Sequence, residues 1–221
     1  MSAKENTSRQ RTVAVIDVGT TSVRMAIAEI SPAGTIQILE HLSQAVNLGK
    51  DTFTRGRIHR DTIEECVQVL KSYQQILGEY GIQSPDDLRV VATSAVREST
   101  NRLAFLDRIY IATGIEIDPM DEAEISRITY LGIQAELERL GTSTDTVVCE
   151  VGGGSTELLL VRNGQIQFSH TYNLGSLRLR SQLMADAVLP GQLADTGRRH
   201  DGISAKCRQN VARFRLYRLR F

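Results

Sequence analysis

The sequence of 221 residues contains no tryptophan, only 4 prolines and only 3 cysteines. Cys66, Cys149 and Cys207 are odd in number, far apart and without histidines at metal-binding spacing. This excludes a disulfide framework and a zinc site. No apolar run approaches the ~18 residues that would suggest a membrane span. With 41% hydrophobic and 24% charged residues, the composition is that of an ordinary globular protein.

The first residues also lack a targeting signal, because the stretch MSAKENTSRQRT is polar and contains no apolar segment. We therefore expect a soluble, cytoplasmic protein with no membrane partner. Lys+Arg and Asp+Glu both number 26, so the formal net charge is zero. Basic residues gather after Pro190, but this segment has neither a periodic apolar face nor a lysine cluster. We expect no specific nucleic-acid partner.

Strand and helix signals alternate along the first part of the chain. Apolar alternation and short turns predict three antiparallel strands, at residues 13–18, 23–30 and 35–46. The pattern continues as helix, strand, helix, strand and helix, at residues 60–80, 88–95, 103–113, 115–118 and 121–140. The last helix is predicted to carry, on or near one face, the apolar residues Ile125, Ile128, Leu131, Ala135 and Leu137. The predicted order is βββαβαβα.

The strand–turn–strand pattern then restarts, with TVVCEV, a Gly-Gly-Gly-Ser turn, a second strand, an Asn-Gly turn and a third strand. Aligning Val15 with Val148 pairs Asp17 with Glu150, Gly19 with Gly152 and Ser22 with Ser155. Each copy has an acid, one apolar residue, a glycine, two small residues and a serine between apolar strands. This internal repeat predicts two similar lobes that face each other across a cleft.

Turns of glycine and small hydroxyl residues expose backbone N–H groups, so a phosphate can approach closely. The candidate phosphate-binding residues are Gly19, Thr20, Thr21, Ser22, Gly152, Gly153, Gly154, Ser155 and Thr156. Asp17 and Glu150 precede these turns, where a carboxylate could hold Mg²⁺ and orient a nucleophile. One such turn alone could equally be a plain hairpin turn, but two copies in register favour phosphate binding.

Five motifs in this order resemble the exopolyphosphatase and guanosine pentaphosphate phosphohydrolase (Ppx/GppA) family: DVGTTSVRMAIAEI, ATSAVRESTN, RITYLG, EVGGGSTELLLV and YNLGSLRL. The resemblance implies an α/β, actin-like ATPase (ribonuclease H-like) fold. One full lobe would span residues 12–141, and a three-strand meander at 142–185 would begin a second lobe. The resemblance also implies hydrolysis of terminal phosphoanhydride bonds in inorganic polyphosphate or guanosine pentaphosphate, with Mg²⁺ as cofactor. The sequence leaves open whether the protein forms a homodimer.

The resemblance implies roles for individual side chains. Asp17 would be the metal or water acid of the first turn, and Glu150 the acid of the second. Glu157 would be the acid that closes the GGGSTE motif, with a catalytic role, and Arg97 the arginine of the cleft. The bidentate fork of an arginine suits phosphate, although Arg97 could also be an ion-pair partner beside a helix.

The sequence departs from the family pattern near the active site. Thr21 stands where asparagine is usual, and Glu150 stands where aspartate is usual. Ile125 aligns with the position at which the family has its general base, a glutamate. An apolar side chain cannot take a proton from water. Either Glu124 or Glu122 substitutes as the catalytic base, or the protein hydrolyses poorly. Glu124 could instead complete a helix N-terminal capping box.

Residues 186–221 do not continue the family pattern, and we expect non-family sequence there, from a frameshifted or aberrant end. The outer face of the meander would then be uncovered and would favour association. Three functions compete. The first is phosphoanhydride hydrolysis. The second is a catalytically impaired module that binds polyphosphate or an alarmone, and the third is phosphoryl transfer to a sugar or acid. The ATSAVRESTN and GGGSTE motifs favour the first two.

Overall fold

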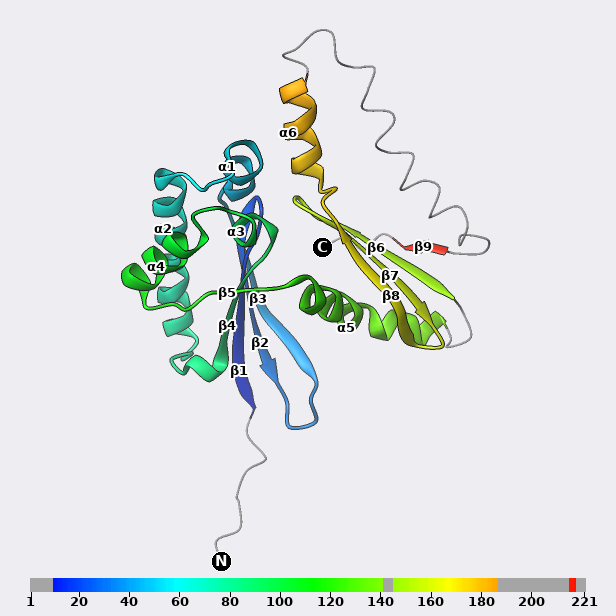
Figure 1. The fold of residues 1–221 in the computed structure, drawn as a ribbon. Helices are drawn as coiled ribbons and strands as arrows, with labels where there is room; N and C mark the ends of the chain where they lie inside the picture. The colour runs from blue at the N-terminus through cyan, green and yellow to red at the C-terminus, as the bar shows by residue number, and fades with distance from the viewer. Residues whose placement is uncertain (1–9, 141–144, 187–214, 218–221) are drawn as a thin grey trace, which may run out of the picture. The chain divides into compact units, whose positions relative to one another are not determined.

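The computed structural model describes residues 10–140, 145–186 and 215–217 (Figure 1). By its contacts the chain divides into two compact units, Met1–Met120 and Asp121–Phe221. Both units combine a β-sheet with α-helices, so the predicted α/β class is confirmed. Within the described part of the chain, no helix has both the length and the hydropathy of a membrane span.

The first unit is built on a five-stranded sheet with the strand order β3-β2-β1-β4-β5. The strands are β1 (Arg11–Val18), β2 (Ser22–Ile30), β3 (Ile36–Ala45), β4 (Leu88–Ala92) and β5 (Asp118–Pro119). The pairs β1–β2 and β2–β3 are antiparallel, whereas β1–β4 and β4–β5 are parallel. The predicted three-strand meander and the predicted parallel strand are therefore confirmed.

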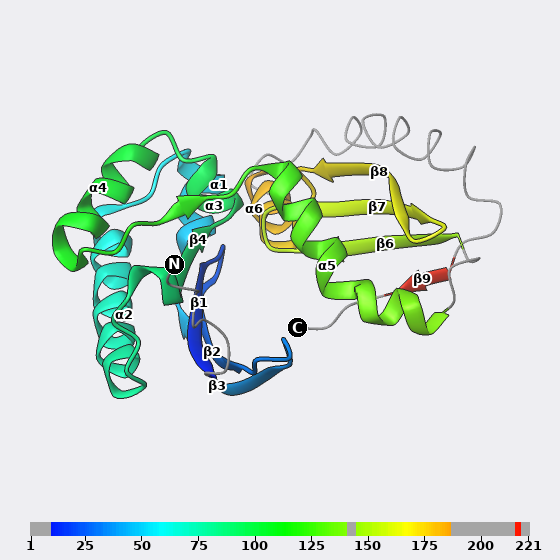
Figure 2. The same cartoon turned by 90° about the horizontal axis from the view of Figure 1, so that it is seen from below.

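Helices cover one face of this sheet. They are α1 (Leu48–Arg55), α2 (Arg60–Glu79), α3 (Ser94–Arg97) and α4 (Arg102–Thr113), and a 3₁₀ turn, η1, spans Pro85–Asp87. Helices α2 and α4 lie side by side (Figures 1 and 2). The apolar residues of α2 are buried in the core, where the Tyr73 hydroxyl donates to the Val23 carbonyl at 2.9 Å. The predicted helices at 60–80 and 103–113 are confirmed.

Three local predictions for the first unit were wrong or incomplete. The strand predicted at 115–118 is displaced toward the C-terminus, because β5 spans only Asp118–Pro119. The strand predicted at 88–95 ends at Ala92, because Ser94–Arg97 turns into the short helix α3. Helix α1 was not predicted, since its sequence LGKDTFTR buries only Leu48, Gly49 and Thr52 and has too few apolar residues to show a period.

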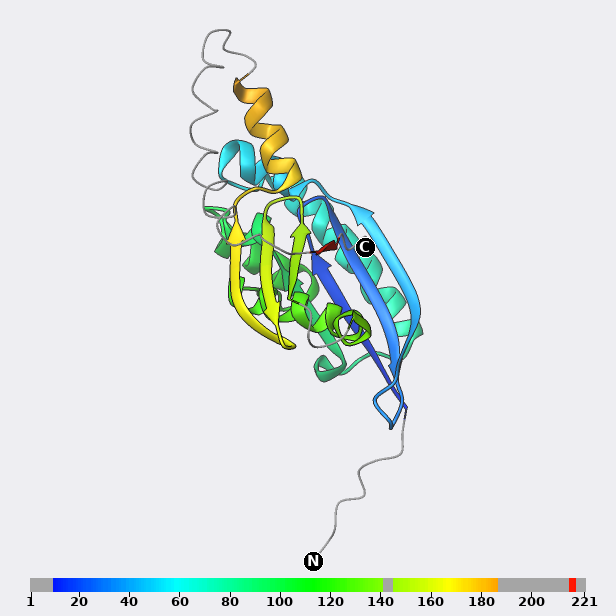
Figure 3. The ribbon, with the colours of Figure 1, turned by 90° about the vertical axis from the view of Figure 1, so that its right-hand side faces the viewer.

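The second unit has a four-stranded sheet with the order β8-β7-β6-β9. The strands are β6 (Thr146–Val151), β7 (Thr156–Arg162), β8 (Gln165–Tyr172) and β9 (Arg215–Tyr217), and the helices are α5 (Glu122–Leu140) and α6 (Ser176–Asp186). Strands β6, β7 and β8 form the predicted antiparallel meander (Figure 3). The predicted Asn163-Gly164 turn has positive φ at both residues, 51° and 69°.

The second unit also differs from the prediction. Residues 142–185 were expected to form only a meander and 186–221 no strand, but α6 follows β8, and β9 pairs in parallel with β6. Helix α6 mixes leucines with arginines and other polar residues, and β9 has only three residues, so neither shows a clear hydrophobic period. The remainder of the predicted tail lies outside the described residues.

Helix α5 packs on the sheet of the second unit, although the predicted first lobe extends to residue 141 (Figure 2). The predicted face of this helix was wrong, because Ile128 and Leu131 are 45% and 49% exposed. Its buried residues are Ser126, Thr129 and Ile133. Two of these are polar, so apolar periodicity could not reveal the buried face.

The opposite face of this sheet carries apolar side chains that no described helix of the second unit covers. Strand alternation places Leu158 and Leu160 there, whereas Leu159 and Val161 join the core beneath α5. Phe168 of the edge strand β8 is 47% exposed and stacks against His170, which in turn meets the edge of Tyr172. Among the described residues this face thus carries half-buried leucines and exposed aromatic residues, and the expectation that it is uncovered stays a prediction.

Candidate phosphate-binding and acidic sites

The two repeated turns close in the same way. The Gly19 amide donates to the Ser22 carbonyl at 3.0 Å, and the Gly152 amide donates to the Ser155 carbonyl at 2.9 Å. A Cβ atom would lie 3.0 Å from the acceptor at Gly19 and 3.4 Å at Gly152. The first glycine of each turn therefore lets the backbone fold back closely on itself.

In the first turn, the carbonyls of Thr20 and Thr21 accept hydrogen bonds, whereas the amides of the same two residues donate none within the described residues. Gly49 donates to the Thr20 carbonyl at 2.8 Å, and Val46 donates to the Thr21 carbonyl at 3.1 Å. Within residues 10–140 and the other described segments, the amides of Thr20 and Thr21 donate to no protein acceptor. The Thr20 hydroxyl lies 3.5 Å from that of Ser94, and both residues are buried. These groups can receive the oxygens of an anion.

Asp17 lies in β1, two residues before the first turn. Arg24, its partner in the β1–β2 register, donates from Nη2 to Asp17 Oδ2 at 2.7 Å. The other oxygen, Oδ1, is buried and has no hydrogen-bond partner among the described residues. Burial raises the pKa of Asp17, and the charge and hydrogen bond of Arg24 oppose this shift. A buried, unpaired carboxylate oxygen fits a bound cation or water.

The acid of the second turn has different neighbours. Glu150 faces Glu157 in the β6–β7 register, so both side chains lie on the face that α5 covers. Thr129 of α5 donates from Oγ1 to Glu150 Oε2 at 2.8 Å. Glu157 is only 4% exposed and accepts from the Ser155 hydroxyl at 2.6 Å. Two opposed acidic side chains, each with a hydroxyl donor, therefore lie beside the second turn.

The carbonyls of the second turn hold the start of α6. The amides of Ser176 and Leu177 donate to the carbonyls of Gly152 and Gly153, both at 2.9 Å. Arg178 donates from Nε to the Gly154 carbonyl at 2.7 Å. In the described segments, the amides of Gly153 and Gly154 have no protein acceptor. As in the first turn, these amides are free to receive a phosphate oxygen.

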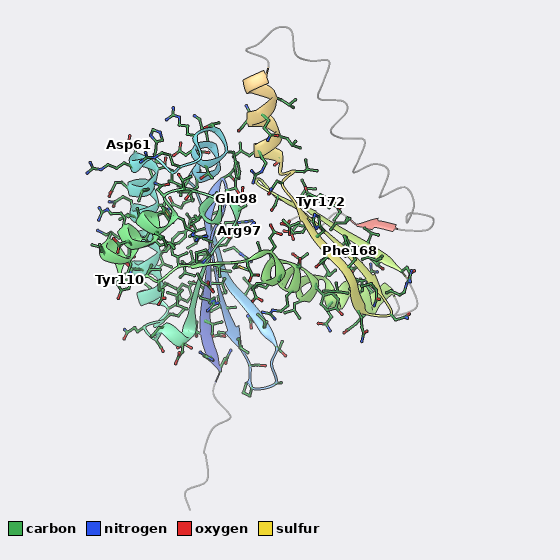
Figure 4. The ribbon with its side chains drawn as sticks, viewed as in Figure 1. Asp61, Arg97, Glu98, Tyr110, Phe168 and Tyr172 are labelled. Carbon is green, nitrogen blue, oxygen red and sulfur yellow. The ribbon has the colours of Figure 1, made fainter. Side chains whose placement is uncertain are left out.

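Two of the remaining predicted residues have structural contacts of their own. Arg97, labelled in Figure 4, is half-buried at the end of α3 and donates from Nη1 to the Met120 carbonyl at 3.0 Å. The Thr156 hydroxyl donates to the Leu174 carbonyl at 2.8 Å. Their roles toward phosphate stay predictions.

Glu124 takes part in the capping arrangement that the sequence suggested. Its amide donates to Asp121 Oδ1 at 2.8 Å. Both of its carboxylate oxygens accept from Arg127, at 2.7 and 2.8 Å. A proton acceptor engaged in this way must first leave its arginine, so a role for Glu124 as general base stays a prediction. Ile125, at the usual base position, is half-buried.

The comparisons with known proteins identify the family. The family model described as the Ppx/GppA phosphatase family matches residues 26–200. This chain belongs to the Ppx/GppA phosphatase family. The α/β, actin-like ATPase fold that the sequence motifs implied is confirmed by solved structures of family members.

Relatives with curated functions are longer than this Ppx/GppA chain. It is 30% identical over 181 residues to a bifunctional 3-dehydroquinate synthase/phosphatase of Fusobacterium nucleatum, covering 80% of this chain and 27% of that protein. It is 28% identical over 195 residues to exopolyphosphatase 2 of Mycobacterium tuberculosis, covering 85% of this chain and 59% of that protein. The chain therefore spans less than two thirds of each of these relatives.

Two solved structures are also similar to this chain over only about half of their own length. The Ppx/GppA family member of Aquifex aeolicus matches with a TM-score of 0.64 and 29% identity, over 76% of this chain and 52% of that one. An exopolyphosphatase of Cytophaga hutchinsonii matches with a TM-score of 0.68 and 26% identity, over 78% of this chain and 53% of that one.

Sequence reasoning about this Ppx/GppA chain missed two side chains at the acids, Arg24 and Thr129. Arg24 could have been found from the strand register, because the short turn places it directly opposite Asp17. The contact of Thr129 had no sequence signal, since it depends on how α5 is rotated against β6. No group of three or more histidine, cysteine or acidic residues gathers as a metal cage within the described segments.

Proposed function

We propose that this chain takes part in hydrolysing the terminal phosphoanhydride bonds of inorganic polyphosphate or guanosine pentaphosphate. The observation that carries the proposal is the repeated turn, which in both copies pairs unengaged amides with a carboxylate two residues before its first glycine. Membership of the Ppx/GppA phosphatase family supports the same reaction.

Phosphate binding falls to the backbone. The amides of Thr20 and Thr21 in one turn, and of Gly153 and Gly154 in the other, receive phosphate oxygens in this proposal. Successive N–H groups in a turn form an anion-binding concavity that needs no side-chain charge. Each turn then holds one phosphoryl group by itself.

Mg²⁺ is the proposed cofactor, and the residues present fit it. Mg²⁺ is bound in proteins through one or two carboxylates, with waters and substrate phosphates completing its shell. Each unit offers such a ligand by itself: the buried, unpaired Oδ1 of Asp17 in the first, and the carboxylate of Glu150, with Glu157 beside it, in the second. When bound, the ion would neutralise charge on the phosphoryl group.

A binding module without efficient catalysis is the second candidate. Ile125 at the usual base position and the engagement of Glu124 by Arg127 favour it. In this case the same turns bind polyphosphate or the alarmone, and no carboxylate is placed to activate water.

The proposal predicts that both turn acids are needed. Asp17→Ala and Glu150→Ala should each lower Mg²⁺-dependent phosphate release from polyphosphate or guanosine pentaphosphate by ~10² or more, since charge stabilisation in the transition state is of that order. Asp145→Ala is the matched control, because Asp145 pairs with Arg162 on the surface.

The measurements are phosphate release, polyphosphate binding and circular dichroism of all variants. If the wild type binds polyphosphate without hydrolysing it, and the acid variants lose this binding, the chain is a binding module. Hydrolysis and binding that survive in both folded acid variants would disprove the site assignment.

A further inference from the structure

The hydroxyl of Thr129 makes a contact that is unusual for a threonine in a helix. Such hydroxyls commonly bond to the carbonyl four residues earlier on their own helix. Thr129 is 9% exposed, and its Oγ1 instead donates across to Glu150 Oε2 on β6 at 2.8 Å. The hydroxyl thus links α5 to the acid of the second turn.

Packing one turn further along the helix fixes this contact. Ile133 is 4% exposed and joins the core cluster of Val148, which lies two residues before Glu150 on the same face of β6. Residues four apart lie on one face of a helix, and residues two apart on one face of a strand. The rotation that buries Ile133 therefore also places Thr129 over Glu150.

The first unit holds its equivalent acid differently. Arg24 binds Asp17 Oδ2 and leaves Oδ1 unpaired. The repeat alignment that pairs Asp17 with Glu150 pairs Arg24 with Glu157, which is itself an acid and accepts from Ser155. A carboxylate cannot replace the arginine as an anchor for Glu150. In the second unit, the anchor comes from the helix.

We propose that Thr129 is a positioning residue that holds the Glu150 carboxylate for a divalent cation. The proposal rests on the proposed function, in which Glu150 is a cation ligand. Thr129 occupies one carboxylate oxygen and so orients the other. Glutamate needs this anchor more than aspartate would, because its longer arm has one more rotatable bond.

The test is Mn²⁺ binding, measured by electron paramagnetic resonance on the full chain with Mg²⁺ as competitor. Thr129→Val keeps the shape of the side chain and removes the hydroxyl, so it should weaken Mn²⁺ affinity at least ~10-fold, as loss of an outer partner of a metal ligand does. Thr129→Ala should have the same effect, and it replaces Thr129→Val if that variant fails to fold. Thr129→Ser keeps the hydroxyl and should stay within about twofold of wild type.

Tyr130→Phe is the matched control on the same helix. The Tyr130 hydroxyl donates to the Gly164 carbonyl at the opposite end of β7, so its loss tests helix docking without touching Glu150. This variant should keep Mn²⁺ affinity. In a Glu150→Asp background, the carboxylate is withdrawn by ~1.5 Å, about one C–C bond. There, Thr129→Val should add little further loss, because the contact is already broken.

The outcomes separate the two proposals. If Glu150→Ala loses Mn²⁺ binding but Thr129→Val and Thr129→Ala retain it, Glu150 is a ligand and the positioning role is wrong. Equal losses in Tyr130→Phe and Thr129→Val would assign the effect to helix docking and also overturn the role. If wild type binds no Mn²⁺, or Glu150→Ala binds it normally, the cation assignment in the proposed function fails, and the positioning role fails with it.

Discussion

Asp17 combines two features that pull its ionisation in opposite directions. Its Oδ1 is buried without a partner among the described residues, and burial disfavours the charged form. Its Oδ2 accepts from Arg24, whose positive charge favours the charged form. Burial is the larger effect, so the pKa of Asp17 lies above its ordinary value of 3.8. The register neighbour on β4 is Val91, which is uncharged.

Arg24→Gln should raise the pKa of Asp17 further, because it removes the charge that opposes burial. The measurement is a titration of the Asp17 carboxyl carbon followed by NMR. Arg162→Gln breaks a comparable surface pair with Asp145 and should leave the titration of Asp17 unchanged. An Asp17 pKa that is the same in wild type and Arg24→Gln would contradict the assigned balance.

The raised pKa of Asp17 makes its contribution to folding stability depend on pH. Because the folded pKa is raised, the folded chain binds the proton more tightly than the unfolded chain. The stability that Asp17 contributes is complete below pH 3.8 and is lost as the pH rises through its folded pKa. In Arg24→Gln this loss should extend to higher pH, which unfolding measured across the acid range can show.

At the scale of elements, the second turn and α6 form one structure through Gly175. This glycine packs so closely on the turn that a Cβ atom would lie 2.3 Å from backbone atoms of Gly153 and Gly154. The three amides that follow it, at residues 176–178, donate to carbonyls of the turn. Any larger residue must move the turn away from the helix.

Gly175→Ala should therefore destabilise the second unit by about 4 kcal/mol or more, as steric conflict with a fixed backbone does. Gly78→Ala is the matched control, because Gly78 is exposed in α2 and a Cβ there meets nothing within 4 Å. The control should stabilise by up to ~1 kcal/mol through helix propensity. Urea unfolding followed by circular dichroism measures both. A Gly175→Ala variant as stable as wild type would show that the turn and helix are not closely packed.

At the scale of the whole molecule, the described residues of the two units form separate cores, and that of the second unit is the smaller. The first core joins β1, β2 and β4 to α2 and α4 through a large set of buried residues, including Ile16, Phe105 and Ile109. In the described part of the second unit, the buried apolar core consists of Ile133, Val148, Leu159 and Val161. Units with separate cores need not unfold together.

We expect two transitions in differential scanning calorimetry, with the second unit melting at the lower temperature. Ile133→Ala should lower only that transition, and Ile109→Ala only the upper one, each by removing about 2–5 kcal/mol of core packing. The pair of variants controls for itself, since each leaves the other core intact. A single transition lowered by both variants would instead show one cooperative unit.

The sequence by itself determined the strand meanders, the main helices and the repeated turns. These depend on local signals, because strand alternation, helix periodicity and glycine turns are encoded by neighbouring residues. The family motifs are also continuous stretches, so the family and fold could be recognised before any contact was known. Weak local signals explain the failures at α1, α6 and β9, and buried polar residues explain the wrong face of α5.

Only the tertiary structure decided what surrounds each turn acid. The repeat makes Asp17 and Glu150 equivalent in sequence, yet Arg24 binds the first, and Thr129 binds the second beside Glu157. These contacts depend on strand register and on the rotation of a helix against a sheet, which are decided by packing between distant segments. The charge of each site follows from those contacts, and no local pattern in the chain encodes it.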